Sequence, residues 1–448
     1  MNNLTVQVKI WGNPVGTLYW DQRQEVAVFE YEPSWLRWGM NLSPLMLPLR
    51  PTPFSFVGNR NACFSGLPGM MADSLPDKFG TQLINEWAMA QGKSPEEITP
   101  LDRLCYVGQR GMGALEYEPA IGKGNRSSRV YVDELAALAG EVFENRLAFQ
   151  EKLLREDKAI LEILNIGTSA GGAKPKAIIA WNRETNEVRS GQVPAGEGFS
   201  YWILKFDGTA YEEHNRITKN PHGIGNIEYA YYKMAVACGI DMSESMLLKE
   251  GEQHHFITKR FDRKEDGSKL HMQTLAGLAH LDRDARHSYE EAFATIRAMN
   301  LPYVQQEEFY RRMVFNVVAR NHDDHTKNHS FLMDERGNWR LASAYDICYS
   351  YSPTGRWTAQ HQLSLGGKQS GFTHEDLMRS GEREGIKNPA AIIEQVVEVI
   401  GRWKEFAKEA GVKEGHIKTI GENLLLLTSR SIYAMNSPKK DQESHLSI

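Results

Sequence analysis

The sequence predicts an α+β protein, with a mixed α/β N-terminal part and a mainly helical C-terminal lobe. Two observations lead to this prediction. Residues 4–10 alternate apolar and polar side chains with a period of two, which is typical of a strand that buries one face, and residues 15–19 and 26–31 continue as short strands. From about residue 290 onward, apolar residues instead recur with the 3.6-residue period of helices that pack against a core.

Composition places the chain among ordinary globular proteins. Its 448 residues are 41% hydrophobic and 24% charged, and this length suggests two or three domains. We divide the chain into residues 1–125, 126–262 and 263–448. The formal net charge of -5 argues against a protein whose whole surface binds nucleic acid, although a local basic patch is compatible with it.

Cysteine usage and hydropathy predict a cytoplasmic protein that is not associated with membranes. The first residues lack a basic stretch followed by an apolar core, so we expect no signal peptide. No run of about 18 apolar residues is present, so we expect no membrane-spanning helix. The cysteines are scattered without a C-x-x-C pair, which favours a reducing compartment over a disulfide framework or a zinc finger. They are Cys63, Cys105, Cys238 and Cys348.

The first part begins as a β meander and continues with helices. A helix is predicted over residues 78–91, and Pro95 is a plausible start for another. Three glycines between Val107 and Glu118 predict a turn between strands. The strands of the meander are predicted at residues 4–10, 15–19 and 26–31.

The middle part opens with a helix and then turns to strands. Residues 132–154 are rich in Ala, Leu and Glu, which predicts a helix. A second helix is predicted over Asn226–Cys238, and Gly239 is expected to end it. Strands are predicted at residues 177–181, 200–206 and 255–261.

The last part is predicted to be mostly helical. Its final dozen residues, 436–448, are polar, and we expect them to be frayed. Helices with a 3.6-residue period are predicted at residues 290–299, 307–320, 390–408 and 417–431.

The most informative segment is NHDDHTKN, residues 321–328. A convincing helix precedes it, and residues 330–333 and 339–345 predict a β-hairpin that ends at Asp346. Protein kinases use this order of elements to transfer a phosphoryl group from ATP. In them an Asp accepts the proton of the substrate hydroxyl, an Asn five residues later binds magnesium, and a second Asp after a hairpin binds the metal ions.

Three residues of this chain fit that pattern. Asp323 and Asn328 have the D-x-x-x-x-N spacing, and Asp346 is placed like the second acid. Oxygen ligands of this kind suit Mg²⁺, which keeps several waters and takes few carboxylates from the protein.

The same segment permits two other interpretations. Its histidines, together with the aspartates, would also suit Zn²⁺ or a pair of metal ions in a hydrolase. A solvated polar loop without chemistry is the third interpretation. Since the D-x-x-x-x-N spacing alone occurs by chance, it is the flanking order of elements that favours the kinase. The histidines are His322, His325 and His329.

A second signal is the glycine-rich, basic segment at residues 166–177. Backbone amides in such a loop can approach phosphates closely. The segment does not match the P-loop pattern, because no Lys-Ser/Thr follows the glycines and a strand is predicted next. It is therefore closer to the flap of a kinase, with an ordinary flexible turn as the alternative.

A third signal is Lys205, a single lysine on an otherwise apolar predicted strand. Such a lysine needs an anionic partner or a route to water. In a kinase it would hold the nucleotide phosphates and pair with a helical glutamate, for which Glu228 is the candidate. An edge-strand lysine that reaches outward to solvent is the alternative.

Together these motifs resemble the HipA family of bacterial toxin kinases, over nearly the whole chain. Residues 323–328 match the family's D-x-H-x-K-N stretch, and Tyr345-Asp346 matches its Y-D. Residues 169–176 match its flap motif, S-x-x-G-A-x-x-K-x, and Lys205 sits at its ATP lysine. Further matches are Lys259–Arg263, which resembles the stretch on the adenine side, and residues 73–77 and 107–114 of the N-terminal part.

The resemblance implies a HipA-type, protein-kinase-like fold and ATP- and Mg²⁺-dependent phosphorylation of serine or threonine. Asp323 would be the catalytic base, Asn328 and Asp346 would hold Mg²⁺, and Ser169 would be the site of autophosphorylation. A phosphate on Ser169 would repel the ATP phosphates and expel the flap. The residues expected at the nucleotide are Gly171, Gly172, Ala173, Lys174, Lys176, Lys205, Glu228, Lys259, Arg260, Phe261 and Lys327.

The resemblance also implies a toxin with a dedicated partner. Targets in the family are translation enzymes such as an aminoacyl-tRNA synthetase, so activity would arrest growth. The usual partner is a small HipB-type antitoxin with a helix-turn-helix, which would carry the contacts to operator DNA.

Some residues depart from the family pattern. Asp324 stands where some members have Gly, and we expect its charge to perturb the pKa of Asp323 or to add a metal contact. Gly171-Gly172 would loosen the flap, and Pro175 would stiffen its exit. Two other function classes stay open, namely a catalytically idle co-repressor or binding module and a metal-dependent phosphohydrolase.

Overall fold

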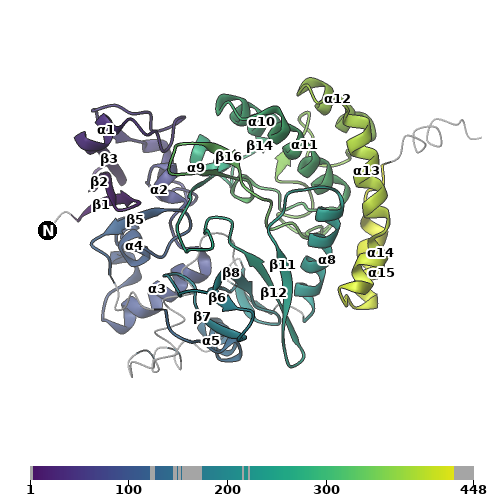
Figure 1. Ribbon diagram of the computed structural model, residues 1–448, viewed down its shortest axis with the longest axis horizontal. Coiled ribbons are helices and arrows are strands. Elements are labelled where there is room, and N and C mark those ends of the chain that lie inside the picture. The colour runs from purple at the N-terminus through teal and green to yellow at the C-terminus, as the bar shows by residue number, and fades with distance from the viewer. Residues whose placement is uncertain are drawn as a thin grey trace, which may run out of the picture.

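The computed structural model describes residues 4–121, 127–144, 149, 153, 174–213, 216–219 and 222–427. The N-terminal strands lie at one end of the molecule and the C-terminal helices at the other, with a second sheet between them (Figure 1). No helix in the described ranges is long and apolar enough to cross a membrane.

An antiparallel sheet of five strands forms the N-terminal end, in the order β4-β3-β2-β1-β5. The sequence predicted its first three strands correctly, and in β1 the alternating residues Val6, Val8 and Ile10 point into the core and are fully buried. The strands are β1 (Thr5–Ile10), β2 (Asn13–Asp21), β3 (Val26–Tyr31), β4 (Phe54–Ser55) and β5 (Leu115–Glu118).

The prediction of a turn over residues 107–118 was wrong at both ends. Val107 ends a helix, and Leu115–Glu118 forms β5, which pairs with β1 far back in the sequence. The helix over residues 78–91 is confirmed. The helices of this part are α1 (Pro33–Trp38), α2 (Gly69–Ala72), α3 (Lys78–Ala90) and α4 (Pro100–Val107), with 3₁₀ turns at Val57–Arg60 and Pro95–Glu97.

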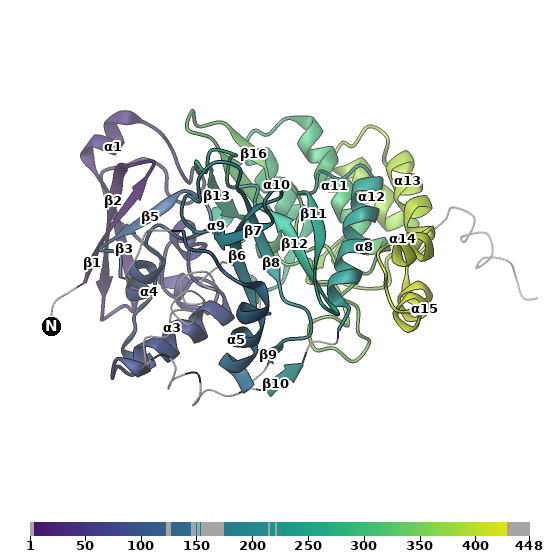
Figure 2. The ribbon, with the colours of Figure 1, turned by 60° about the horizontal axis from the view of Figure 1, so that its bottom comes forward.

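The second sheet has the strand order β11-β12-β8-β6-β7, and Figure 2 shows it between the N-terminal sheet and the C-terminal helices. Helix α5 (Val132–Glu144) shares a buried core with this sheet, whereas most of the predicted helix beyond residue 144 lies outside the described residues. Its strands are β6 (Lys176–Asn182), β7 (Glu187–Ser190), β8 (Ser200–Lys205), β11 (Ser245–Glu250) and β12 (Gln253–Lys259), beside a separate pair, β9 (Ala210–Glu213) and β10 (Arg216–Lys219).

Helix α8 (Ile224–Ala237) connects the second sheet to the C-terminal lobe. It packs against β12 on one side and against α14 on the other. As the sequence predicts, it ends before Gly239, whose φ of 79° lies in the left-handed region.

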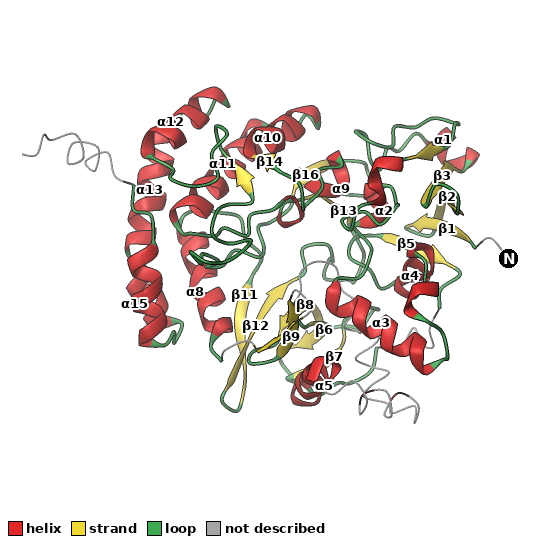
Figure 3. Cartoon of the chain, turned by 180° about the vertical axis from the view of Figure 1, so that it is seen from behind, coloured by secondary structure: helices red, strands yellow, loops and turns green. Residues whose placement is uncertain are grey.

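The C-terminal lobe is built from helices around one large apolar core. In Figure 3 helix α13 lies beside α8 and α11, and α11 packs directly on α13. The helices are α9 (Leu275–Ala279), α10 (Tyr289–Ala298), α11 (Tyr303–Val318), α12 (His374–Arg383), α13 (Pro389–Gly401), α14 (Trp403–Glu409) and α15 (Glu414–Asn423).

Two predicted C-terminal helices have different bounds in the structure. The segment 390–408 is two helices, because the backbone leaves helical geometry at Arg402, where ψ is 16°. The last helix ends at Asn423, since Leu424 is extended, with a ψ of 140°.

The predicted hairpin after residue 329 is present and joins a third strand. Its second strand is shorter than predicted and ends at Leu341. The strands of the lobe are β13 (His271–Thr274), β15 (Ser330–Met333) and β16 (Trp339–Leu341) in one sheet, and β14 (His287–Ser288) with β17 (Leu363–Ser364) in another.

Candidate active site

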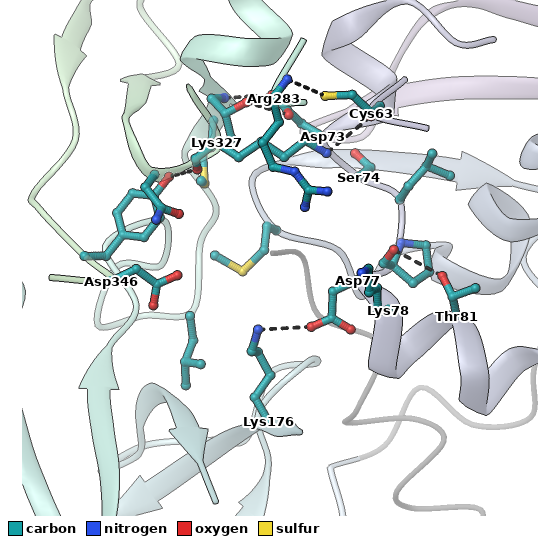
Figure 4. A pocket seen from close by; sticks show the side chains of 18 of the residues that line it. Cys63, Asp73, Ser74, Asp77, Lys78, Thr81, Lys176, Arg283, Lys327 and Asp346 are labelled. Carbon is teal, nitrogen blue, oxygen red and sulfur yellow. Dashed lines mark hydrogen bonds and ion pairs between the residues drawn. The ribbon is translucent and has the colours of Figure 1, made fainter. Parts of the chain in front are cut away.

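A cavity of about 630 Å³ opens where the three parts of the chain meet, and we call it the central cavity. Its size lies within the range of small-molecule sites, about 300–1,000 Å³. Residues 73–78 supply one wall, β6 and β8 another, and the C-terminal lobe the third (Figure 4). The predicted site residues on its walls are Lys176, Lys205, Lys259, Arg260, Phe261, Lys327, Asn328 and Asp346.

Lys205 pairs with two carboxylates at the wall of the cavity. Its ammonium forms ion pairs with Glu228 on α8 and with Asp346 of the C-terminal lobe. Burial disfavours the charged lysine, but the two carboxylates more than compensate and raise its pKa above the usual range. The structure therefore brings together three predicted residues from three separate elements.

Asp346 is ionised at this position. Burial alone would raise its pKa, but the nearby charges of Lys205 and Lys176 hold the pKa at about 2. Its backbone is in the left-handed region, with a φ of 52°. The neighbouring Tyr345 donates a hydrogen bond to the carbonyl of Lys327 (2.6 Å), which joins the two halves of the predicted metal site.

A glycine lets α8 carry Glu228 to Lys205. A Cβ atom at Gly225 would lie 2.2 Å from the carbonyl oxygen of His254 on β12, so only glycine permits this close approach of helix to sheet. Lys205 itself ends the central strand β8, where Phe256 of β12 lies opposite it. The pairing of Lys205 with Glu228 thus depends on this close helix–sheet contact.

Asp323 is anchored through its backbone while its side chain remains accessible. Its N–H donates to Oγ of Ser350 (3.0 Å), and its carbonyl accepts a hydrogen bond from Nδ2 of Asn328 (2.7 Å). The carboxylate is 53% exposed and lies 3.7 Å from Nε2 of His325. Because Asn328 uses its amide nitrogen, its side-chain oxygen is the atom that can ligate a cation.

Asp324 does not play the role expected from the sequence. It is buried, and its carboxylate accepts hydrogen bonds from the Tyr289 hydroxyl (2.6 Å) and the backbone N–H of Gln362 (2.8 Å), with Nδ1 of His361 at 2.8 Å. Asp324 is not among the residues that line the central cavity. The expectation of a metal contact is therefore corrected, since the side chain is turned into the lobe.

Two histidines of the same loop, His322 and His329, are buried among other ring side chains. The ring of His322 contacts that of His361 with centroids 4.1 Å apart and the planes tilted by 36°, and burial lowers the pKa of His322 to about 3. His329 packs against Phe309 and Tyr289, and burial lowers its pKa to about 4. Within the described ranges, no three His, Cys, Asp or Glu side chains are placed to hold a metal ion together. This geometry does not support the hydrolase interpretation.

Arg260 is a cavity residue with structural partners. Its side chain is fully buried and pairs with Asp262 at 2.7 Å. Arg263 pairs with the same carboxylate at 2.8 Å, and the backbone N–H of Gly113 donates to it at 2.6 Å. The guanidinium of Arg260 thus holds the second sheet to the N-terminal part, a role the sequence analysis did not assign.

Asp77 is a residue whose role the sequence analysis missed. It lies 3.1 Å from Lys176, and both side chains are almost completely buried. Lys176 in turn stands directly opposite Lys205 across the β6–β8 pair. Burial raises the pKa of Asp77 to about 6, even though Lys176 acts to lower it. The match of residues 73–77 to the family pattern was the available signal.

The remaining predicted residues divide into two groups. Lys174 is exposed and does not line the cavity, whereas Lys327 lines it and its Nζ donates to the carbonyl of Cys63 (3.3 Å). The flap residues predicted to bind the nucleotide or to be phosphorylated lie outside the described residues. These are Ser169, Gly171, Gly172 and Ala173.

Comparison with protein families gives two matches that together cover most of the chain. Residues 168–424 match the family described as HipA-like C-terminal domain, and residues 6–118 match the family described as HipA N-terminal domain.

Curated relatives carry related names. A Haemophilus influenzae protein named "Putative kinase" is 29% identical over 209 residues, which cover 40% of this chain and 60% of that protein. A Sinorhizobium fredii protein, "Putative kinase Y4dM", is 24% identical over 47% of this chain and 53% of its own length. The chain therefore spans less than two thirds of each of these relatives. "Putative kinase Y4mE" of the same organism is 24% identical over 460 residues, 96% of this chain and 92% of that protein.

A solved structure shares the fold over nearly the whole chain. It is that of the Shewanella oneidensis MR-1 toxin–antitoxin system HipA, HipB and its operator DNA. The TM-score is 0.61 and the identity 15%, over 93% of this chain and 94% of that chain. This likeness confirms the predicted fold class.

Proposed function

Because this chain belongs to the HipA family, we propose that it is an ATP- and Mg²⁺-dependent serine/threonine kinase. The observation that carries the proposal is the joint ion pairing of Lys205 with Glu228 and Asp346 in the wall of the central cavity. Kinases require this lysine–glutamate pair and the metal-binding aspartate to be in place together.

The residues present fit Mg²⁺–ATP. Asn328 and Asp346 offer an amide oxygen and an ionised carboxylate on the same cavity, which are ligands that Mg²⁺ prefers. Ile203 and Phe261 give the cavity an apolar wall that suits an adenine ring. Bound Mg²⁺–ATP would supply the phosphoryl group and offset its charge during transfer.

The chain's own groups have distinct tasks in this reaction. Lys205 holds the phosphates, and Glu228 orients the ammonium of Lys205. The exposed carboxylate of Asp323 accepts the proton of the acceptor hydroxyl, while Ser350 and Asn328 keep its backbone in place. We place autophosphorylation at Ser169 of the glycine-rich flap, where the new charge would oppose ATP binding.

We further propose that the protein acts in the cytoplasm as the toxin of a HipBA-type toxin–antitoxin pair. The fold it shares with the HipA of a HipA–HipB–operator complex supports this proposal. Its partner would be a HipB-type helix-turn-helix antitoxin, through which it would reach operator DNA. Its substrate would be a translation-related protein such as an aminoacyl-tRNA synthetase.

The test is incubation of the purified protein with Mg²⁺ and γ-labelled ATP, followed by mapping of the labelled residue. We expect label on Ser169 that is lost in Ser169→Ala and Asp323→Asn. The matched control is Asp266→Asn, which alters an exposed aspartate in the turn after β12. Label that persists in Asp323→Asn would contradict the role of Asp323, and an unlabelled wild type that also forms no ADP would contradict the kinase.

A further inference from the structure

A continuous chain of hydrogen bonds begins at the backbone of Asp323. Its N–H donates to Oγ of Ser350 (3.0 Å), and the Ser350 hydroxyl donates to Oδ1 of Asn321 (3.0 Å). The amide nitrogen of Asn321 then donates to Oδ1 of Asn316 on α11 (2.9 Å). Each of these groups donates a hydrogen bond to the next, so all the hydrogen bonds of the chain point in one direction.

The chain ends on the carboxylate of the adjacent residue, Asp324. The amide nitrogen of Asn316 donates to the Tyr289 hydroxyl (3.2 Å), and that hydroxyl donates to Oδ2 of Asp324 (2.6 Å). An ionised carboxylate only accepts hydrogen bonds, so the single proton of Tyr289 must point toward Asp324. The carboxylate of Asp324 is therefore the final acceptor of a chain whose first donor is the backbone N–H of Asp323.

The site around Asp324 is built for a charged carboxylate. The side chain is completely buried, and besides Tyr289 it is bonded by His361 and by the backbone N–H of Gln362, at 2.8 Å each. Burial opposes ionisation, but His361 and the hydrogen bonds outweigh it and lower the pKa of Asp324. A buried and fully bonded anion of this kind holds its neighbours in one arrangement.

The network also fixes the segment that follows the metal-site acid. We take this segment as residues 347–362, which follow Asp346. Ser350 near its start binds the backbone of Asp323, and Gln362 at its end binds the carboxylate of Asp324. In protein kinases the activation segment follows this acid and must be positioned for activity. One pair of adjacent aspartates thus holds both ends of the segment beside the proposed base.

We infer that Asp324 is a positioning residue, which acts through Tyr289, Asn316, Asn321 and Ser350 to hold Asp323 in reach of the acceptor hydroxyl. The inference rests on the proposed kinase function. Asp324 touches neither ATP nor the acceptor in this account, because its carboxylate is completely buried and bonded to Tyr289, His361 and Gln362. Its effect is therefore expected in turnover and not in nucleotide affinity.

Tyr289→Phe is the sharpest variant, because it removes one oxygen atom and interrupts the chain at its last link. Tyr310→Phe is the matched control: Tyr310 is equally buried in the same lobe, but its hydroxyl donates to the carbonyl of Leu377 (2.8 Å) outside the chain. Asp324→Asn is a second variant. Its side-chain NH₂ is a hydrogen-bond donor and would face groups that now donate to Asp324, such as the Tyr289 hydroxyl and the Gln362 N–H.

Three measurements on the full-length protein separate positioning from loss of folded protein. Titration with a non-hydrolysable ATP analogue counts competent sites, and ADP formation with Mg²⁺–ATP gives kcat per competent site and KM. Hydrogen exchange reports whether the amide of Asp323 is still protected. We expect Tyr289→Phe to lower kcat by about tenfold or more, since small displacements of reacting groups are costly.

The same experiment defines what would overturn the inference. KM for ATP should stay within about twofold of wild type in Tyr289→Phe, and the Asp323 amide should exchange faster, because only the anchoring of the loop changes. Equal kcat per competent site in Tyr289→Phe and Tyr310→Phe, or unchanged exchange at Asp323, would overturn the positioning role. A wild type that forms no ADP would instead contradict the proposed function, and the exchange comparison would then decide the inference by itself.

Discussion

At the scale of single residues, the central cavity brings two lysines close together, and both need carboxylates as partners. Lys176 and Lys205 stand opposite each other on β6 and β8, and like charges in that position destabilise a sheet. Each lysine is compensated by carboxylates from other parts of the chain, Asp77 for Lys176 and Asp346 with Glu228 for Lys205. These ion pairs therefore join the parts of the chain that line the cavity, without a bound nucleotide.

Replacement of Lys205 tests this balance. In Lys205→Met the carboxylates of Glu228 and Asp346 lose their shared cation. Breaking a fully buried pair costs about 3–5 kcal/mol of the free energy of unfolding, and we expect a smaller loss here because the side chains of Lys205 and Asp346 are 21% and 31% exposed. We expect Lys205→Met combined with Asp346→Asn to recover part of this loss, because one of the two carboxylates is then neutral. Kinase activity should be lost in both variants.

Urea unfolding of the single and double variants measures the coupling. Lys249→Met, on an exposed position of β11, is the control and should unfold like wild type. A double variant that is less stable than either single variant would show that Lys205 and Asp346 do not compensate each other.

The buried Asp77 makes stability depend on pH. Its folded pKa of about 6 exceeds the value of about 4 for an unfolded Asp, so between these values the folded protein binds more protons than the unfolded chain. The free energy of unfolding therefore falls as pH rises through this window, by up to ~3 kcal/mol in total. We expect Asp77→Asn to lack this decrease.

The measurement is urea unfolding between pH 4 and pH 7. Relative to Asp77→Asn, wild type should lose stability as pH rises, whereas Glu394→Gln, on an exposed position of α13, should follow wild type. Parallel profiles for wild type and Asp77→Asn would show that Asp77 does not titrate in this window.

At the scale of elements, the end of β12 is joined to the N-terminal part by one buried carboxylate. Asp262 pairs with Arg260 and Arg263, and the two arginines reach the carbonyls of Gly111 and Gly113. The two guanidinium groups hold the pKa of Asp262 below its usual range although burial opposes this. The network holds the second sheet against the loop before β5.

Neutralising the Asp262 carboxylate should strongly destabilise the contact between the second sheet and the N-terminal part. Asp262→Asn leaves two buried arginines of like charge without their counterion, so we expect a loss of about 3–5 kcal/mol in the free energy of unfolding. The control is Asp266→Asn, four residues along the chain in an exposed turn. Similar unfolding midpoints in urea for the two variants would contradict the role of Asp262.

At the scale of the whole molecule, the core of the N-terminal part is completed by the C-terminal lobe. Its buried cluster includes Ala276 and Met333 of the C-terminal lobe. Residues 73–78 also form a wall of the central cavity. The three-part division of the chain thus stays a prediction about sequence segments, because packing and the candidate site both cross it.

Removal of the N-terminal part should therefore damage the rest of the molecule. A chain of residues 127–448 would expose Met333 and Ala276 and would lack both Asp77, which pairs with Lys176, and the Gly113 N–H that donates to Asp262. We expect it to aggregate and to bind a non-hydrolysable ATP analogue at least about tenfold more weakly, as apolar surface and cavity wall are lost. Light scattering and calorimetric titration measure both effects. A monomeric fragment with wild-type affinity would show that the two parts are independent.

The sequence by itself determined the kinds of elements and the order of the candidate site. Periods of two and 3.6 residues identified the first strands and most of the long helices, because these periods follow from which face of an element is buried. The spacing of Asp323, Asn328 and Asp346, with Lys205 and Glu228 before them, indicated a kinase-like site, since protein kinases use these residue types in that order.

Only the tertiary structure decided which side chains meet. The pairing of Asp77 with Lys176, the burial of Asp324 and the structural partners of Arg260 all depend on strand order and on close backbone contacts such as that at Gly225. A local pattern records the face that a residue presents but not the distant element that comes to lie against it. For that reason the sequence identified the charged groups of the site, and the fold assigned their partners.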